Sequence, residues 1–104
     1  ERYSGSMKSQ TPIHPGEILS ADFMQPLAIS INRLARDLHV PPNRIHAIVH
    51  GQRGITADTA LRLAAYFRTT PELWLNLQTE YDLRLARRTA GAEIARVVHP
   101  REAA

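Results

Sequence analysis

Ile31–His50, INRLARDLHVPPNRIHAIVH, is the stretch that decides the fold. It predicts two short helices joined by a tight turn, because Val40-Pro41-Pro42 prevents one helix from continuing, while Pro42 suits the first turn of the next. The small Ala35 fits the place where two steeply crossing helices come closest. Apolar side chains on both segments are placed to hold the pair together: Leu34, Leu38, Val40, Ile45 and Ile48. This spacing predicts a helix-turn-helix unit.

The outer face of the second segment, Pro42–His50, is left with polar and small side chains. Arg pairs with guanine, Asn with adenine, and Ala touches the thymine methyl, so this face suits a helix that reads the DNA major groove. The residues predicted to lie at the groove are Pro42, Asn43, Arg44, His46, Ala47 and His50. Phosphate contacts are expected on both sides of them, from Ser30, Asn32, Arg33, Gln52 and Arg53.

Positive charge is concentrated in the same stretch. The chain has 13 Lys and Arg against 10 Asp and Glu, a net charge of +3. Between Ser30 and Ile55 stand four arginines and one acidic residue, Asp37, so this segment by itself carries +3. A local field of this sign suits a polyanion such as nucleic acid. A solvated helix face is the alternative explanation.

Three further helices are expected around the unit. The first runs from Pro15 to about Met24, with Pro26 closing it. The fourth runs from about Ala57 to Phe67, and the fifth from Pro71 to about Ala90, ending before Gly91. The expected helix caps are Ser30 for the second helix and Thr56 for the fourth, and His39 is expected at a left-handed turn position.

The ends of the chain are expected to be less regular. Residues 1–12 are polar and without period, which predicts a flexible leader before a DNA-binding domain over 13–70. A C-terminal helix over 71–92 follows, and 93–104 form a tail in which Ile94, Val97 and Val98 make a short extra element. The apolar side chains of the fifth helix recur at spacings of three and four, and some are expected at a dimer interface: Trp74, Leu77, Tyr81 and Leu85.

Composition excludes several classes of protein. The chain has no cysteine, which rules out disulfides and thiolate metal sites, and a bacterial-type cytoplasm is the expected location. No apolar run approaches the roughly 18 residues of a membrane span. His46 and His50 have the spacing of a metal-binding pair, but Ala47 stands where a catalytic zinc helix carries Glu, and no third ligand is evident. No metal, cofactor or enzymatic activity is therefore expected.

Several sequence motifs, in this order, resemble those of the HigA-type antitoxin family, a VapI-like branch of the Cro/repressor-type (XRE-like) helix-turn-helix proteins. They are His14-Pro15-Gly16-Glu17-Ile18-Leu19, Leu34-Ala35-Arg36-Asp37-Leu38, Val40-Pro41-Pro42-Asn43-Arg44-Ile45, Gly51-Gln52-Arg53-Gly54-Ile55-Thr56, Ala57-Asp58-Thr59-Ala60-Leu61-Arg62-Leu63-Ala64, Trp74-Leu75-Asn76-Leu77-Gln78 and Tyr81-Asp82-Leu83. The resemblance covers residues 14–83 and implies an all-α, five-helix, lambda-repressor-like domain.

The resemblance also implies a function. Such proteins neutralise a small toxin of HigB type, an endoribonuclease that acts on mRNA, and repress their own operon by binding palindromic operator DNA. A homodimer is expected, because two copies related by a two-fold axis read two half-sites roughly 34 Å apart. Two alternatives stay open: a free-standing repressor without a toxin, and a protein-interaction module that has lost DNA binding.

Overall fold

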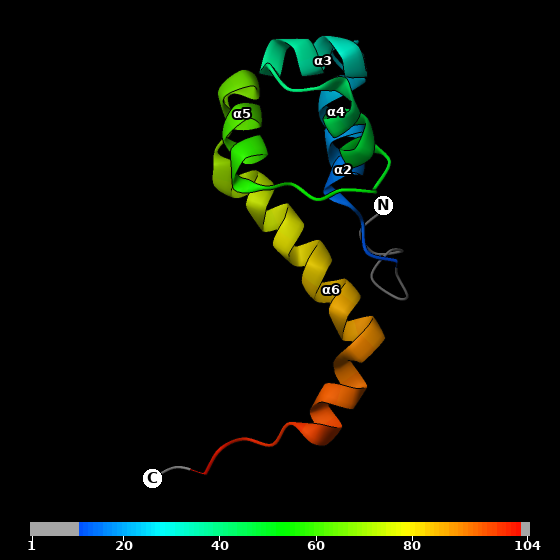
Figure 1. Ribbon diagram of the computed structural model, residues 1–104, viewed down its shortest axis with the longest axis vertical. Helices are drawn as coiled ribbons and strands as arrows, with labels where there is room; N and C mark the ends of the chain where they lie inside the picture. Colours follow the sequence, from blue (N-terminus) through cyan, green and yellow to red (C-terminus); the bar gives the residue numbers. More distant parts are fainter. Residues whose placement is uncertain (1–10, 103–104) are drawn as a thin grey trace.

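The computed structural model describes residues 11–102, and this range contains helices and connecting loops but no strand (Figure 1). The elements in order are α2 (Pro15–Ile18), η1 (Leu19–Met24), α3 (Ile31–Leu38), α4 (Pro42–Val49), α5 (Ala57–Phe67) and α6 (Pro71–Val97). Because η1 follows α2 without a break, the described range contains five helical segments. The predicted all-α, five-helix class is confirmed. Most of the leader expected over residues 1–12, and the last two residues of the tail, lie outside the described range.

The predicted helix signals lie where the sequence placed them. The Ser30 hydroxyl caps α3 by accepting from the Arg33 backbone N–H at 3.0 Å, and the Thr56 hydroxyl caps α5. His39 ends α3 with φ 60° and ψ 47°, the left-handed conformation expected at this turn. Gly51 follows α4 with φ 75°, which a glycine adopts without steric cost.

The first helical segment has a cap that the sequence did not reveal. The Nδ1 of His14 accepts a hydrogen bond from the Gly16 backbone N–H at 2.9 Å, so this side chain caps α2. The helix widens into the π-helical turn η1 and ends at Met24, two residues before Pro26 as expected.

The core lies where α2, α3, α4, α5 and the start of α6 meet. Trp74 is its largest side chain and is 0% exposed. Its ring contacts Phe23 at a centroid distance of 4.9 Å, and its Nε1 donates to the Thr69 hydroxyl at 2.8 Å. The prediction that Trp74 contacts a second copy of the chain is therefore wrong, because this side chain is buried in the core of its own domain.

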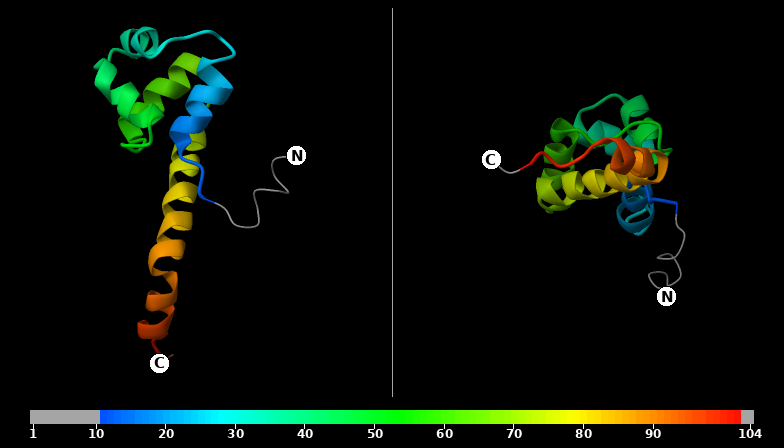
Figure 2. Two further views of the ribbon diagram at one scale, coloured as in Figure 1. Left: turned by 90° about the vertical axis from the view of Figure 1, so that its right-hand side faces the viewer. Right: turned by 90° about the horizontal axis from the view of Figure 1, so that it is seen from below.

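α6 is longer than predicted. It passes through Gly91 and ends at Val97, so the expected stop before Gly91 and the separate element after it are both wrong. A glycine inside a helix costs only about 1 kcal/mol, and ion pairs between neighbouring turns, such as Arg84 with Glu80, support the exposed part of this helix. We call the part of the domain formed by α2, η1, α3, α4, α5 and the start of α6 the helical head. Figure 2 shows the rest of α6 leaving this head as a rod. No helix in the described range is long and apolar enough to cross a membrane.

Candidate nucleic-acid interface

α4 is supported from beneath as its sequence predicts. Ile45 and Ile48 point into the core and are fully buried, as is Ala35 on the facing side of α3. On its other side α4 rests on the first turn of α2, where Gly16 allows the two backbones to approach closely. The inner face of α4 is thus fully occupied by packing, which leaves its outer face to solvent.

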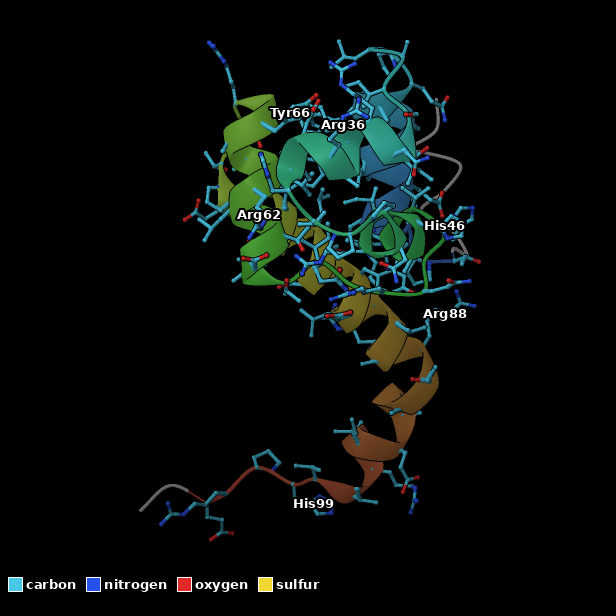
Figure 3. All side chains as sticks on the ribbon, turned by 45° about the horizontal axis from the view of Figure 1, so that its top comes forward. Arg36, His46, Arg62, Tyr66, Arg88 and His99 are labelled. Carbon is cyan, nitrogen blue, oxygen red and sulfur yellow. The ribbon has the colours of Figure 1, made fainter. Side chains whose placement is uncertain are left out.

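The predicted groove-facing residues lie on that outer face with different exposure. Pro42, Asn43, His46 and His50 are exposed, whereas Arg44 and Ala47 are half-buried. In the view of Figure 3, His46 on α4 and Arg62 on α5 lie on opposite sides of the helical head. The predicted phosphate contacts are all exposed: Ser30, Asn32, Arg33, Gln52 and Arg53. The structure thus keeps these residues open to solvent near the two ends of the motif.

Two histidines form a stacked pair on α4. The rings of His46 and His50 have a centroid distance of 4.1 Å and an interplanar angle of 29°. The Nδ1 of His50 donates to the His46 backbone carbonyl at 2.8 Å, which orients the outer ring. In residues 11–102 no three His, Cys, Asp or Glu side chains are grouped to hold a metal ion. The pair therefore presents two flat rings with hydrogen-bonding edges to solvent.

Arg44 has a partner that the sequence did not suggest. Its Nη1 donates to Asp58 Oδ2 on α5 at 2.8 Å, and its Nε is buried without a hydrogen-bond partner. Asp58 also accepts from the Arg62 Nε at 2.9 Å. The hydrogen bonds from Arg62 and then Arg44 hold the pKa of the Asp58 carboxyl below its usual value. This carboxylate therefore stays charged and joins α4 to α5.

The turn between α3 and α4 is fastened to α5 by a second set of contacts. Arg62 Nη1 donates to the Leu38 carbonyl at 2.8 Å, at the end of α3 where free carbonyls accumulate. The Tyr66 hydroxyl donates to Asp37 Oδ2 at 2.7 Å, and this bond is the main cause that lowers the pKa of the Asp37 carboxyl. The same bond raises the pKa of the Tyr66 hydroxyl. α5 thus fixes the angle between the two motif helices.

α6 holds the loop that follows α4. Gln78 Oε1 accepts from the Ile55 backbone N–H at 2.7 Å, and the ring of Tyr81 packs edge-on against His14 at 4.8 Å. Burial lowers the pKa of the His14 imidazole, although the carboxylates of Glu17 and Asp82 act in the opposite direction. Of these supporting residues, sequence reasoning could have found only the Asp58–Arg62 pair, from its i,i+4 spacing.

The three other residues of the predicted dimer interface differ in how far they are exposed. Leu77 is partly buried against the core of its own domain, and Tyr81 is half-buried beside His14. Leu85 is 40% exposed on the part of α6 that leaves the head. Of these three, Leu85 is thus the most open to a partner.

The comparisons with known proteins agree with this geometry. Residues 21–74 match the family described as Helix-turn-helix. Virulence-associated protein I of Dichelobacter nodosus is 55% identical over 80 residues, covering 76% of this chain and 74% of that protein. The structure of an addiction module antidote protein of the HigA family from Coxiella burnetii is 51% identical with a TM-score of 0.84, covering 88% of this chain and 100% of that one.

A further solved structure was determined with DNA. Pseudomonas aeruginosa antitoxin HigA with the higBA promoter is 46% identical to this chain with a TM-score of 0.84, covering 86% of this chain and 97% of that one. The family match over residues 21–74 includes α3, α4 and α5. By sequence and by fold, the chain belongs to the helix-turn-helix family and, within it, to the HigA-type antitoxins.

Proposed function

We propose that the protein is the antitoxin of a type II toxin–antitoxin system, which neutralises a partner mRNA-interferase toxin of HigB type and represses its own operon by binding operator DNA. The observation that carries the DNA-binding part is α4, which is packed from beneath and presents Asn43, His46 and His50 to solvent. A relative 46% identical to the chain was solved with promoter DNA. Such binding places the action of the protein in the cytoplasm.

The proposed contacts divide into two kinds. Base edges are read from α4 by Asn43, Arg44, His46, Ala47 and His50, with Pro42 at the helix start. Phosphates are held by Ser30, Asn32 and Arg33 near the start of α3 and by Gln52 and Arg53 after α4, where they set the position of the protein without reading sequence. The backbone N–H groups at the start of α3 favour an anion in the same place.

The test is a binding titration with the promoter of the gene and with random DNA of equal length. Arg44→Ala should weaken promoter binding by roughly 1–3 kcal/mol and random binding by less. Arg87→Ala, which removes the same charge from an exposed position on α6, is the matched control and should affect both DNAs little. Equal losses on the two DNAs would show that Arg44 does not read bases.

The toxin partner is tested through the neighbouring gene. Expression of a small adjacent reading frame should stop growth, and co-expression of this protein should restore it. A neighbour that is harmless when expressed would favour the second candidate, a free-standing repressor, provided that the promoter is still bound.

We also propose that the protein acts as a homodimer. The part of α6 outside the head carries exposed apolar side chains, including Leu83, Leu85, Ile94 and Val97, and the burial of such surface favours association. One domain contacts about one half-site, so a two-fold dimer is needed to read a palindrome. Sedimentation should give a dimer, and Leu83→Glu with Ile94→Glu should shift it to monomer. A monomeric wild-type protein would contradict the proposal.

A further inference from the structure

Arg44 is the third residue of α4, at the end that leads into a groove, yet its guanidinium is turned back toward α5. Its side chain is only 24% exposed, and Nη1 is bonded to Asp58 Oδ2 at 2.8 Å. The exposed side chains of Asn43 and His46, by contrast, make no hydrogen bond to α5. In this structure of the free protein, the arginine best suited to guanine is therefore held away from solvent.

The docked position of Arg44 is only weakly stabilised. The single oxygen Oδ2 of Asp58 accepts from both Arg44 and Arg62, and the Asp58 side chain is 56% exposed. An ion pair on a carboxylate this open to solvent shifts an equilibrium by about fivefold at most. The Arg44 Nε is buried without a partner, which opposes docking because a desolvated donor has lost its hydrogen bond to water. A ligand that satisfies more of the guanidinium can therefore draw Arg44 away from Asp58.

Operator and random DNA differ in what they offer Arg44. A guanine edge offers two acceptors in the plane of the guanidinium, and such a contact changes affinity by roughly 5- to 150-fold. A phosphate in random DNA can also accept two N–H groups of a guanidinium, but it lies on the solvated outside of the duplex, where salt screens its charge, so it competes less well with the nearby carboxylate. The docked position thus withdraws one positive charge from non-specific binding and releases it where a guanine is present.

We infer that Asp58 is a specificity-determining residue. Its ion pair with Arg44 keeps this arginine from binding DNA phosphates and breaks when Arg44 binds a guanine edge in the operator. This inference rests on the proposed function. It assigns Arg44 two positions, docked on Asp58 in the free protein and extended into the groove on the operator. Asp58 itself touches no base.

The experiment is Asp58→Asn, measured on random and on promoter DNA over a range of salt concentrations. Removing the carboxylate frees Arg44 for phosphates, whereas Arg62 keeps its hydrogen bond to the Leu38 carbonyl. Random DNA should therefore bind up to about fivefold more tightly at 0.15 M salt, with a salt slope steeper by about 0.9. Promoter binding should gain less, because Arg44 already leaves Asp58 there. The ratio of promoter to random affinity should therefore fall.

Two further variants separate this mechanism from simple charge repulsion. In an Arg44→Ala background, Asp58→Asn should no longer tighten random binding, since the cation that it would release is absent. Glu72→Gln removes a carboxylate from the same position of α6, the second residue of the helix, and should leave both affinities unchanged. An equal gain with and without Arg44, or a gain of the same size from Glu72→Gln, overturns the inference. A loss of binding to both DNAs by a folded Asp58→Asn protein also overturns it.

A measurement without DNA keeps this inference distinct from the proposed function. The Arg44 Nε–H signal of the free protein, observed by ¹⁵N NMR, should be protected from exchange and should lose that protection in Asp58→Asn. A wild-type protein that binds no DNA but shows this change would refute the proposed function and leave the docked position of Arg44 established. An unprotected Arg44 signal in the wild type would overturn the inference itself.

Discussion

Gly16→Ala should push α2 away from α4, the helix that it supports. A methyl group at Gly16 would lie 1.8 Å from the Ile48 carbonyl oxygen, 2.7 Å from the Ile48 carbonyl carbon and 3.0 Å from the Val49 Cα. These are backbone atoms near the end of α4, so no side-chain rotation relieves the overlap. Overpacking of this kind costs roughly 1–3 kcal/mol, and the rigid obstacle places Gly16→Ala at the upper end.

The net change in the free energy of unfolding follows by subtraction. Alanine is favoured over glycine in a helix by at most about 1 kcal/mol, which leaves a loss of about 2 kcal/mol. In a domain of this size, each kcal/mol lowers the melting temperature by about 4–8 °C. Gly16→Ala should therefore melt roughly 10 °C below the wild type. It should also bind promoter DNA more weakly, because the end of α4 is displaced.

The assay is thermal unfolding followed by circular dichroism, with Gly91→Ala as the matched control. At Gly91 the nearest atom to an added methyl group is the Arg87 Cβ, at an ordinary contact distance of 3.7 Å. The same substitution there should stabilise the protein by up to about 1 kcal/mol. The reasoning is refuted if Gly16→Ala melts at or above the wild-type temperature, or if both variants shift in the same direction.

Three further predictions concern residues that support the site. Burial lowers the pKa of His14, so the unfolded chain binds a proton first as the pH falls below about 6.5; the melting temperature should drop there until the folded pKa is reached, and His14→Asn should flatten this drop. The Tyr66 hydroxyl is the main cause that lowers the pKa of Asp37 in the folded protein. The charged Asp37 therefore stabilises the fold above the usual carboxyl pKa, and this contribution is lost as the pH falls through the pKa of the folded state. Tyr66→Phe should reduce that acid dependence in a pH series of unfolding curves, and an unchanged series would contradict the role of the bond. Trp74→Ala should cost about 3–5 kcal/mol because it empties the core; a native-like melting temperature would show that the head does not depend on this side chain.

Local chemistry explains which parts of the fold were predictable. The double proline, the Ser30 and Thr56 caps and the glycine after α4 act on their own neighbours in sequence, so the bounds of α3 and α4 and the start of α5 follow from them. The end of α6 could not be predicted from such signals, because a glycine only weakens a helix and no proline occurs until Pro100. The stop signal expected at Gly91 was too weak to end the helix.

The predicted outer face of α4 is open to solvent at most of its residues, but the contacts that α4 makes within the domain were not predicted. Periodicity separates the buried face of α4 from its outer face, so Asn43, His46 and His50 could be named in advance. Periodicity does not say which neighbour covers an apolar residue, and for that reason Trp74 was assigned to a second copy of the chain rather than to the core of its own domain.

The sequence by itself determined the helix-turn-helix unit, its caps and its outward face, because these depend on contacts between residues close in the chain. Only the tertiary structure decided that Arg44 docks on Asp58, that Arg62 and Tyr66 hold the motif turn, and that Gly16 must have no side chain. These contacts join residues that lie 14 or more positions apart, and the packing of the whole head sets their distances. No pattern of neighbouring residues carries that information.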